Sequence, residues 1–458
     1  MGYKEKYLLV AVLHIALCGF LFAYTLSVMN TCADNISASL DWGDNQDSYV
    51  TLFSTLVPIG AVFGGMTAGI LSNKYGRRGS IMIADSVMFF GSCIVVLPST
   101  WSFGIGRFIT GVASGFFLTI APVFINEITP DELIPTYGPI VQITNNIGVV
   151  VAYFLGLPLP SEDYNDDDFN NWWIFMLFVP GILSFYQFCY FLLCNKHESP
   201  LWLLRYEKKD EAIIALKQVY DDEDLEKGIK RFDRSSKEDA KLINSGEKEY
   251  SYFEIFKLKK FRKMLRVGII LGIIQQFSGV NSAVIYSTYI FEELGGSTYM
   301  ARIYTIITVI VFFMGCFLSI LLLNKFGRKT MLIFGTISLS IVMFLLGIVT
   351  LFEFHIIFAV ILISAVYVFF TVSLGATLWT YIGEALTEKI ASVSSTVILS
   401  MVCVVSGLFP VFTEMFGIYY CFFFFSLCMA LGSIYIWIDI TETRGKTKNQ
   451  ILEEMYFH

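Results

Sequence analysis

Long apolar runs, separated by short polar stretches, recur along the whole chain and limit the folds that it can adopt. Each run is close to the roughly 20 residues that an α-helix needs to cross a bilayer. Apolar residues make up 55% of the 458-residue chain and charged residues only 16%, which is typical of a membrane protein with many spans. We therefore predict an all-α membrane protein with twelve transmembrane helices. We place them near residues 7–29, 50–71, 80–97, 104–126, 137–156, 172–194, 264–288, 302–323, 331–351, 356–382, 391–413 and 417–438.

Charge is distributed unequally between the connections on the two sides of these runs. Basic residues gather in one set of connections, and the opposite loops carry mainly acidic residues. By the positive-inside rule the basic side is cytoplasmic, and both termini are predicted to lie there. The basic residues are Lys74, Arg77, Arg78, Lys325, Arg328, Lys329, Arg444, Lys446 and Lys448, together with those of the 196–263 segment; the acidic ones are Asp34, Asp41, Asp44, Asp47, Glu162, Asp163, Asp166, Asp167 and Asp168.

One long polar segment, residues 196–263, separates the sixth run from the seventh. Charges alternate there with apolar residues at helical spacing, such as Ile213, Ile214 and Leu216, so we expect short amphipathic helices packed beneath the membrane rather than an unstructured linker. On the opposite side, Asn35-Ile36-Ser37 is an acceptor sequence for N-glycosylation.

The residues that would support an enzyme or a metal site are scattered. The nine cysteines include no Cys-x-x-Cys pair, and the four histidines have no metal-ligand spacing. No nucleophile–base pair or phosphate-binding loop is evident. We therefore expect no catalytic residue, no metal, no cofactor, no enzymatic activity and no nucleic-acid partner.

Three carboxamides interrupt the seventh apolar run. They are Gln275, Gln276 and Asn281, and polar groups at such depth are costly and usually functional. Amides both donate and accept hydrogen bonds, which suits the hydroxyls of a ligand. A straight helix would hold Gln276 and Asn281 about 140° apart, but Gly279 offers a point of unwinding, as in the broken helices of transporters. The alternative is that the amides only join two membrane helices.

An internal repeat relates the two parts of the chain. Residues 73–80 follow the second run and resemble residues 324–330 after the eighth. Glu127 likewise corresponds to Glu384, and Glu198 corresponds to Glu442. Such parallel repeats predict two six-helix halves with the substrate bound between them. The expected boundaries are 1–195 for the first half, 196–263 for the helical linker, 264–440 for the second half and 441–458 for a short tail.

These motifs resemble those of the sugar porter family of the major facilitator superfamily. The pattern Gln-Gln-x-x-Gly-x-Asn, followed by Tyr286-Ser287, is similar to the seventh-helix signature of that family, and further motifs recur in order from Gly19 to Thr447. The resemblance implies facilitative transport of a hexose, D-glucose above all, by alternating access. It also implies that the protein works as a monomer in the plasma membrane.

The resemblance also implies which residues contact the sugar. Gln142 matches a sugar-contacting glutamine, and Phe370 and Trp379 match aromatic positions that line the cavity. The family's Asn-Trp pair in the eleventh span is replaced by Val402-Cys403, and we hypothesise that Asn145 supplies the missing amide. The expected substrate-binding residues are Gln142, Asn145, Gln275, Gln276, Asn281, Phe370 and Trp379.

A second set of residues is expected to form a charge network at the cytoplasmic side. In the family, basic turns and acidic helix ends pair across helices when the inner gate is shut. Simple positive-inside anchoring would explain the arginines but not the glutamates. We hypothesise that Glu127 and Glu384 latch the outward-open state. The network comprises Arg77, Arg78, Glu127, Glu198, Arg328, Glu384 and Glu442.

The first span bears on the energy source. Proton-coupled members carry an acid where this chain has Thr25, and a threonine hydroxyl does not titrate in the physiological range. Arg107, the partner of that acid in the family, remains. The sequence favours a uniporter. The alternatives are a proton-coupled porter of a sugar or polyol that uses Asp85, and a sugar receptor. The receptor is the weaker alternative, because such receptors carry long cytoplasmic tails and the tail predicted here, 441–458, is short.

Overall fold

The computed structural model describes residues 3–160, 171–221, 225–226, 228–229, 252–323, 325–446, 450–451 and 454–455. The acidic residues predicted between 162 and 168, most of the linker from 222 to 251 and Lys448 lie outside this part. Within the described residues the chain is helical, and its β-structure consists of one isolated bridge between Tyr3 and Tyr220. The predicted all-α class is confirmed.

The predicted spans are recovered in the described residues. Ten helices there are long and apolar enough to cross a membrane. The stretch Gly43–Val95 holds the second and third predicted spans, and the fifth corresponds to the shorter apolar helix Ile140–Leu155. Twelve predicted spans therefore correspond to ten long helices because two are joined and one is short.

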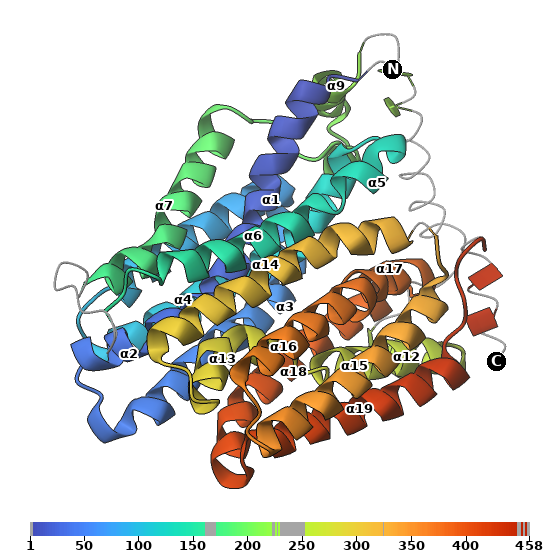
Figure 1. The fold of residues 1–458 in the computed structure, drawn as a ribbon. Coiled ribbons are helices and arrows are strands. Elements are labelled where there is room, and N and C mark those ends of the chain that lie inside the picture. Colours follow the sequence, from blue (N-terminus) through green and yellow to red (C-terminus); the bar gives the residue numbers. More distant parts are fainter. Residues whose placement is uncertain are drawn as a thin grey trace. The chain divides into compact units, whose positions relative to one another are not determined.

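Figure 1 shows the helices in chain order. The longer ones and those near the site are α1 (Glu5–Ser27), α2 (Met29–Ser39), α3 (Gln46–Val95), α4 (Thr100–Ile128), α5 (Ile134–Tyr137), α6 (Ile140–Leu155), α7 (Trp172–Leu193), α8 (Pro200–Arg205), α9 (Lys209–Val219), α11 (Tyr252–Lys257), α12 (Arg262–Gln276), α13 (Val280–Glu293), α14 (Thr298–Leu323), α15 (Arg328–Leu351), α16 (Ile356–Phe370), α17 (Ala376–Ala385), α18 (Glu388–Phe416) and α19 (Ile418–Asp439).

The chain divides into two compact units that interleave along the sequence. Unit 1 comprises Met1–Leu26, Ile59–Val149 and Leu177–Tyr250, and unit 2 comprises Ser27–Pro58, Val150–Met176 and Ser251–His458. Two segments of the predicted first half therefore belong to unit 2. The predicted boundaries at 195, 263 and 440 stay predictions.

In unit 1, helices α3 and α4 pack closely because small residues face each other. A Cβ added to Gly64 would lie 2.0 Å from the carbonyl oxygen of Val112, and one added to Gly115 would lie 2.1 Å from that of Ala61. Small residues allow membrane helices to approach to backbone contact. This spacing leaves no room for a side chain at either glycine.

The described part of the linker is helical, as predicted. The side chain of Ser199 caps α8 by accepting a hydrogen bond from the backbone N–H of Trp202. On α9, Leu216 and Val219 are buried in the same apolar core as Leu8 of α1. Helices α8 and α9 are therefore packed parts of unit 1, whereas α11 belongs to unit 2.

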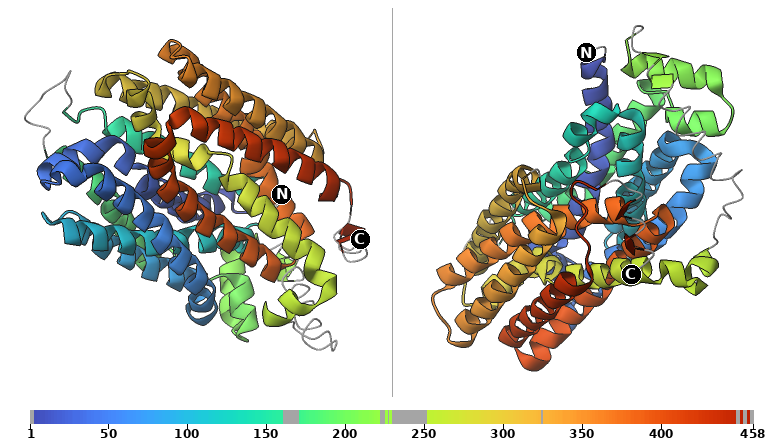
Figure 2. Two further views of the ribbon diagram at one scale, coloured as in Figure 1. Left: turned by 90° about the horizontal axis from the view of Figure 1, so that it is seen from below. Right: turned by 90° about the vertical axis from the view of Figure 1, so that its right-hand side faces the viewer.

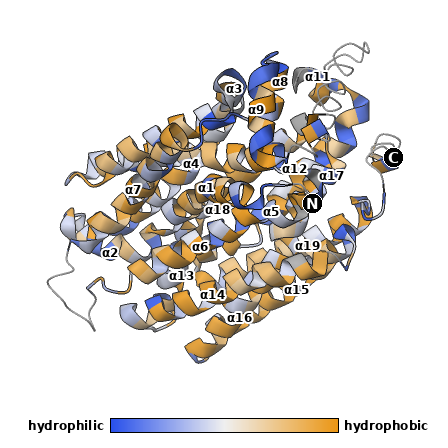
Figure 3. Cartoon of the chain, turned by 90° about the horizontal axis from the view of Figure 1, so that it is seen from above, coloured by the Kyte–Doolittle hydropathy of each residue, from blue (hydrophilic) through white to orange (hydrophobic). Residues whose placement is uncertain are grey.

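In unit 2, α15 and α19 run side by side (Figure 2). The hydroxyls of Ser340 and Ser426 join these two helices, since each donates to the other residue's carbonyl oxygen, at 2.9 and 2.7 Å. Large apolar side chains such as Trp437 and Ile438 face outward, with 68% and 71% exposure, and hydrophobic residues run along the length of these helices (Figure 3). Helices that are apolar on their outer faces suit contact with lipid.

Candidate functional site

The seventh apolar run is broken at the predicted glycine. Helix α12 ends at Gln276 and α13 begins at Val280, with Gly279 between them at φ = 77°. This left-handed conformation favours glycine, and a Cβ there would lie 2.7 Å from a ring carbon of Phe425. The break predicted at Gly279 is confirmed, and both its backbone angle and its packing require glycine.

The break aligns the three predicted carboxamides in a row. Asn281 Nδ2 donates to Gln276 Oε1, and Gln276 Nε2 lies 3.5 Å from Gln275 Oε1. Gln275 Nε2 then donates to the carbonyl oxygen of Leu374 at 3.0 Å. The unwound segment thus brings together two amides that a straight helix would hold about 140° apart. The contact between Gln275 and Leu374 joins α12 to the tenth span. The geometry of the amide row is therefore compatible both with joining two helices and with binding a ligand.

The partner of Gln275 belongs to an irregular part of the tenth span. Residues Thr371–Gly375 form a π-helical turn between α16 and α17, and such turns are frequent at functional sites. Phe370 is the last residue of α16 and is 9% exposed, whereas Trp379 on α17 is 38% exposed. The two predicted aromatic contacts therefore flank the turn.

A second irregularity lies within α13, where Asn30, a residue not predicted from the sequence, hydrogen-bonds to the backbone. Tyr286 has φ = −124° and ψ = 20° within α13. In a regular helix the N–H of Thr288 would donate to the carbonyl of Val284. Instead, the Asn30 amide lies between them: its Nδ2 donates to Val284 O at 3.1 Å, and its Oδ1 accepts from Thr288 N at 3.1 Å.

The Asn30 amide thus replaces one backbone hydrogen bond and joins α2 to α13 within unit 2. Its Nδ2 also donates to Ser287 Oγ at 2.7 Å, and the hydroxyl of Tyr153 donates to the same Val284 carbonyl. The available sequence signal was a single asparagine at the end of the first apolar run, which is equally typical of a loop.

The predicted residues of the fifth span lie in unit 1. Gln142 is exposed, and its Nε2 donates at 3.2 Å to Oδ1 of Asn146, one turn later on α6. Asn146 is fully buried, whereas Asn145 is half-buried. Two adjacent asparagines, Asn145 and Asn146, were visible in the sequence, but only Asn145 was predicted to be a site residue. Gln142 and Asn145 belong to unit 1 and the other five predicted contacts to unit 2; a common sugar site stays a prediction.

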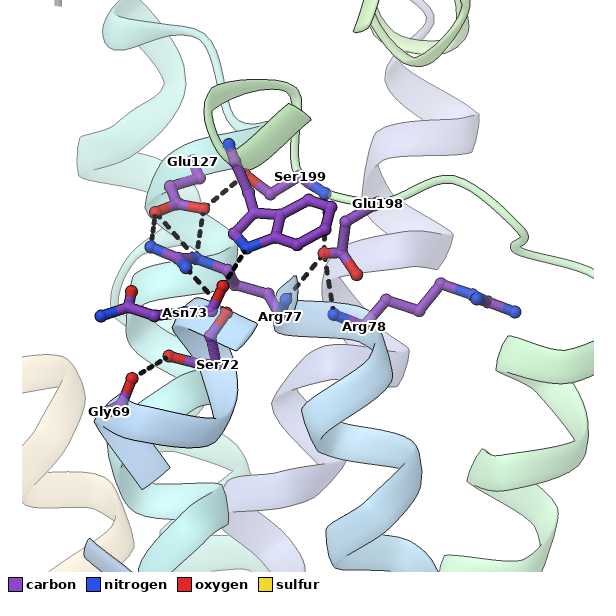
Figure 4. Close-up of polar contacts among 9 residues, drawn as sticks. Gly69, Ser72, Asn73, Arg77, Arg78, Glu127, Glu198 and Ser199 are labelled. Carbon is purple, nitrogen blue, oxygen red and sulfur yellow. Dashed lines mark hydrogen bonds and ion pairs between the residues drawn. The ribbon is translucent and has the colours of Figure 1, made fainter. Parts of the chain in front are cut away.

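The first charge cluster, shown in Figure 4, forms where the second and third spans meet. Arg77 Nε donates to Glu127 Oε2 at 2.8 Å and Arg77 Nη2 donates to Oε1 at 2.7 Å, with side-chain exposures of only 7% and 9%. Ser199 donates its hydroxyl proton to the same carboxylate. Such a fork-to-carboxylate pair is the strong form of an ion pair.

Glu198 completes this cluster by capping the helix that begins after the turn. Its Oε1 accepts the backbone N–H of Arg77 at 2.8 Å and of Arg78 at 2.9 Å. Gly76 makes this approach possible, because it has φ = 83° and a Cβ there would lie 2.2 Å from Glu198 Oε2. Burial raises the pKa of Glu198, and the backbone N–H groups of Arg78, Ser199, Gly79 and Arg77 oppose that rise.

The second charge cluster repeats this plan after the eighth span. Arg328 Nη2 donates to Glu384 Oε1 at 2.9 Å, and Thr443 donates its hydroxyl to Glu384 Oε2 at 2.6 Å. Glu442 accepts the backbone N–H of Arg328 at 2.8 Å and of Lys329 at 3.1 Å. Together with Arg78, which donates to the carbonyls of Phe191 and Asn195, all seven predicted network residues lie in these two clusters.

The residue at the position of the proton-coupling acid is buried. Thr25 is 3% exposed and Arg107 is 1% exposed. Arg107 Nη1 donates at 2.8 Å to the backbone carbonyl oxygen of Thr25. The arginine therefore contacts the position expected from the resemblance, but through the main chain.

Comparison with known proteins covers nearly the whole chain. Residues 11–455 match the family described as "Sugar (and other) transporter". The glucose transporter GlcP of Staphylococcus epidermidis is 26% identical, over 96% of this chain and 95% of its own. A facilitated trehalose transporter Tret1-2 homolog of Drosophila simulans is 28% identical over 97% and 90%, and hexose transporter 1 of Plasmodium knowlesi is 27% identical over 95% and 90%.

Solved structures show the same fold. The inward-open xylose transporter XylE from E. coli matches with a TM-score of 0.81 at 20% identity, covering 98% of this chain and 100% of that one. The XylE proton:xylose symporter bound to 6-bromo-6-deoxy-D-glucose matches with a TM-score of 0.78 at 23% identity, covering 99% and 100%. The predicted major facilitator fold is confirmed, as is the prediction that the protein is not an enzyme. This chain is a member of the sugar porter family of membrane transporters.

Proposed function

We propose that this protein is a facilitative hexose transporter, with D-glucose as its substrate, working by alternating access. The observation that carries the proposal is the amide row of Gln275, Gln276 and Asn281 at the helix break. Amides at a broken membrane helix offer both donors and acceptors to sugar hydroxyls. The printed names of the glucose and hexose transporters among the relatives support a hexose.

The uniport part of the proposal depends on Thr25. A hydroxyl at the position of the coupling acid cannot carry the driving proton, and Arg107 contacts the backbone carbonyl of Thr25. Proton symport is the second candidate, because structures with this fold include a proton:xylose symporter. Asp85, a fully buried acid on α3, would then be the coupling group.

Single substitutions in the amide row test the sugar site. We expect Asn281→Leu and Gln276→Leu each to raise the KM for D-glucose about tenfold, as the loss of one hydrogen bond to a hydroxyl implies. Ser340→Ala is the matched control, because it removes a half-buried hydroxyl contact to Ser426 that has no role in the proposal. Unchanged KM values in both leucine variants would remove the amide row from the sugar site.

The predicted contribution of Asn145 has its own test. It is the half-buried amide on α6 proposed to replace the amide lost at Val402-Cys403. Asn145→Leu should weaken D-glucose uptake, and an Asn145→Leu variant that transports normally would show that this residue is not a contact.

The charge clusters are proposed to latch the outward-open state through Glu127 and Glu384. Replacing both by glutamine keeps their size but weakens their pairing with Arg77 and Arg328. The double variant should shift the two-state equilibrium toward inward-open. Increased labelling of cysteines introduced into the inner vestibule would show this shift, and unchanged labelling would exclude the latch.

The unequal charge of the connections supports an orientation with both termini in the cytoplasm, and we further propose that the protein is a monomer of the plasma membrane. Tags at the two ends should then react with antibody only after the cell membrane is permeabilised. Staining of intact cells would reverse the proposed orientation.

A further inference from the structure

Three polar side chains are buried in the interior of unit 1, each on a different helix. They are Cys18 on α1, Asp85 on α3 and Gln187 on α7, and each is 0% exposed. Gln187 Nε2 lies 3.4 Å from Cys18 Sγ and also donates to the backbone carbonyl of His14. Asp85 lies within electrostatic range of the Cys18 thiol. None of these residues takes part in the proposed sugar site.

This cluster lacks one hydrogen-bond donor. Both carboxyl oxygens of Asp85 and the Oε1 of Gln187 are buried without a hydrogen-bond partner in the described part of the chain. An ionised carboxylate and an amide oxygen are both acceptors, so neither can satisfy the other. A buried polar atom left unpaired costs about 1–3 kcal/mol, and more if it is charged.

The described groups around the cluster supply no compensating charge. The Cys18 thiol interacts electrostatically with Asp85, and it would add negative charge if ionised. His14 on α1 is engaged by the Val10 carbonyl and the Tyr186 hydroxyl, at 2.7 and 2.9 Å, and stacks on Tyr190. Among the described residues no Lys, Arg or His forms an ion pair with Asp85. An unpaired carboxylate here would cost several kcal/mol.

We propose that Asp85 is a proton-binding site and that its carboxyl group holds the proton in the folded protein. A protonated carboxyl is a donor as well as an acceptor. Its O–H then donates to Gln187 Oε1, the unpaired acceptor that shares the Cys18 neighbour, and one proton satisfies two otherwise unpaired groups. The site joins α1, α3 and α7, and it holds its proton throughout transport because the carboxyl has no exposed surface.

Infrared difference spectroscopy of the full-length protein in lipid tests this inference. The wild type minus Asp85→Asn spectrum at neutral pH should contain the C=O band of a protonated carboxylic acid, with a shift in D2O. Gln187→Leu should move this band to higher frequency without abolishing it, since the carboxyl loses its acceptor. A spectrum with carboxylate bands alone at Asp85 would overturn the proposal.

Chemical modification gives a second readout that does not depend on the Asn variant folding. Dicyclohexylcarbodiimide reacts with protonated carboxyls in apolar surroundings, so the wild-type peptide containing Asp85 should gain the adduct mass at neutral pH, and absence of the adduct would contradict the site. Loss of the infrared band on adding D-glucose would contradict the claim that Asp85 keeps its proton throughout transport. The uniport proposal is tested by a different assay: sugar accumulation driven by a proton gradient would contradict uniport, and the infrared and labelling results do not depend on it.

Discussion

The two charge clusters follow one sequence pattern but differ in the number of hydrogen bonds in the arginine–glutamate pair and in its burial. In the first, Arg77 makes a two-pronged contact with Glu127, and the side chains are only 7% and 9% exposed. In the second, Arg328 reaches Glu384 through one nitrogen, with exposures of 20% and 33%. Arg328 Nε is buried without a hydrogen-bond partner in the described chain, whereas Arg77 Nε is bonded to Glu127.

The two clusters share the glutamate cap of the turn but differ in the arginine–glutamate ion pair. Both clusters keep a glutamate that caps the backbone after the turn, and both glycines, Gly76 and Gly327, lie so close to it that a Cβ would fall 2.2 Å from its Oε2. The arginine–glutamate pair is the variable part. We infer that the first cluster stabilises unit 1 in addition to its proposed part in the latch, and that opening the looser second pair requires less free energy.

The largest effect is expected when the glutamate of each arginine pair is removed. Glu127→Ala leaves the buried Arg77 guanidinium without its partner, which should destabilise the protein by about 3–5 kcal/mol. Glu384→Ala exposes a partly solvated arginine and should cost about 1 kcal/mol. Thermal unfolding of the two variants in the same detergent measures the contrast, and equal losses would refute the distinction between the clusters.

The two turn glycines are expected to give the next largest effect. Gly76→Ala and Gly327→Ala should both displace the capping glutamate, because the new Cβ would lie 2.2 Å from a carboxylate oxygen in each case. Gly76 alone has a left-handed backbone, with φ = 83°, so Gly76→Ala should cost about 1–2 kcal/mol more. A larger loss in Gly327→Ala, measured by the same unfolding assay, would contradict this reading.

Replacing each arginine by lysine is a smaller change, because it keeps the positive charge. Lysine is a point charge and cannot form the fork that Arg77 makes with Glu127. Arg77→Lys should therefore cost about 1–3 kcal/mol, while Arg328→Lys keeps its single contact and should change stability by less than about 1 kcal/mol. The reverse order of unfolding temperatures would show that the one-nitrogen contact of Arg328 is the stronger one.

The smallest expected effect is the pH dependence at Glu198. Burial raises its pKa above the ordinary 4.5, so the folded protein binds this proton more tightly than the unfolded chain does. The stability contributed by the proton is present below the ordinary pKa and is lost as pH rises through the raised one. Glu198→Gln should therefore flatten the change of unfolding temperature between pH 7 and 5, and a variant with the wild-type slope would exclude Glu198 as its source.

The sequence predicted features that local chemistry determines. The apolar runs set the helices, and Gly279 marked the break because a glycine amid polar residues can take a left-handed backbone. The repeat of basic turns and acidic helix ends located the two clusters, although it gave no way to tell the tight pair from the loose one. That difference arises from burial, which depends on packing around each pair.

Features that need tertiary contacts were beyond the sequence. The insertion of Asn30 into α13 depends on a kink at Tyr286 and on α2 lying beside it. The pairing of Gln142 with Asn146 rather than with Asn145 depends on which face of α6 is buried. The π-helical turn at Thr371–Gly375 likewise leaves no simple pattern in the apolar tenth span.

The most direct test of the proposed function is uptake of labelled D-glucose into liposomes that contain the purified protein. It should be compared with and without an imposed inward proton gradient. Saturable uptake that only equilibrates the sugar and ignores the gradient is the expected result, because Thr25 cannot carry a proton. Accumulation driven by the gradient would contradict uniport and would point to Asp85 as the coupling acid.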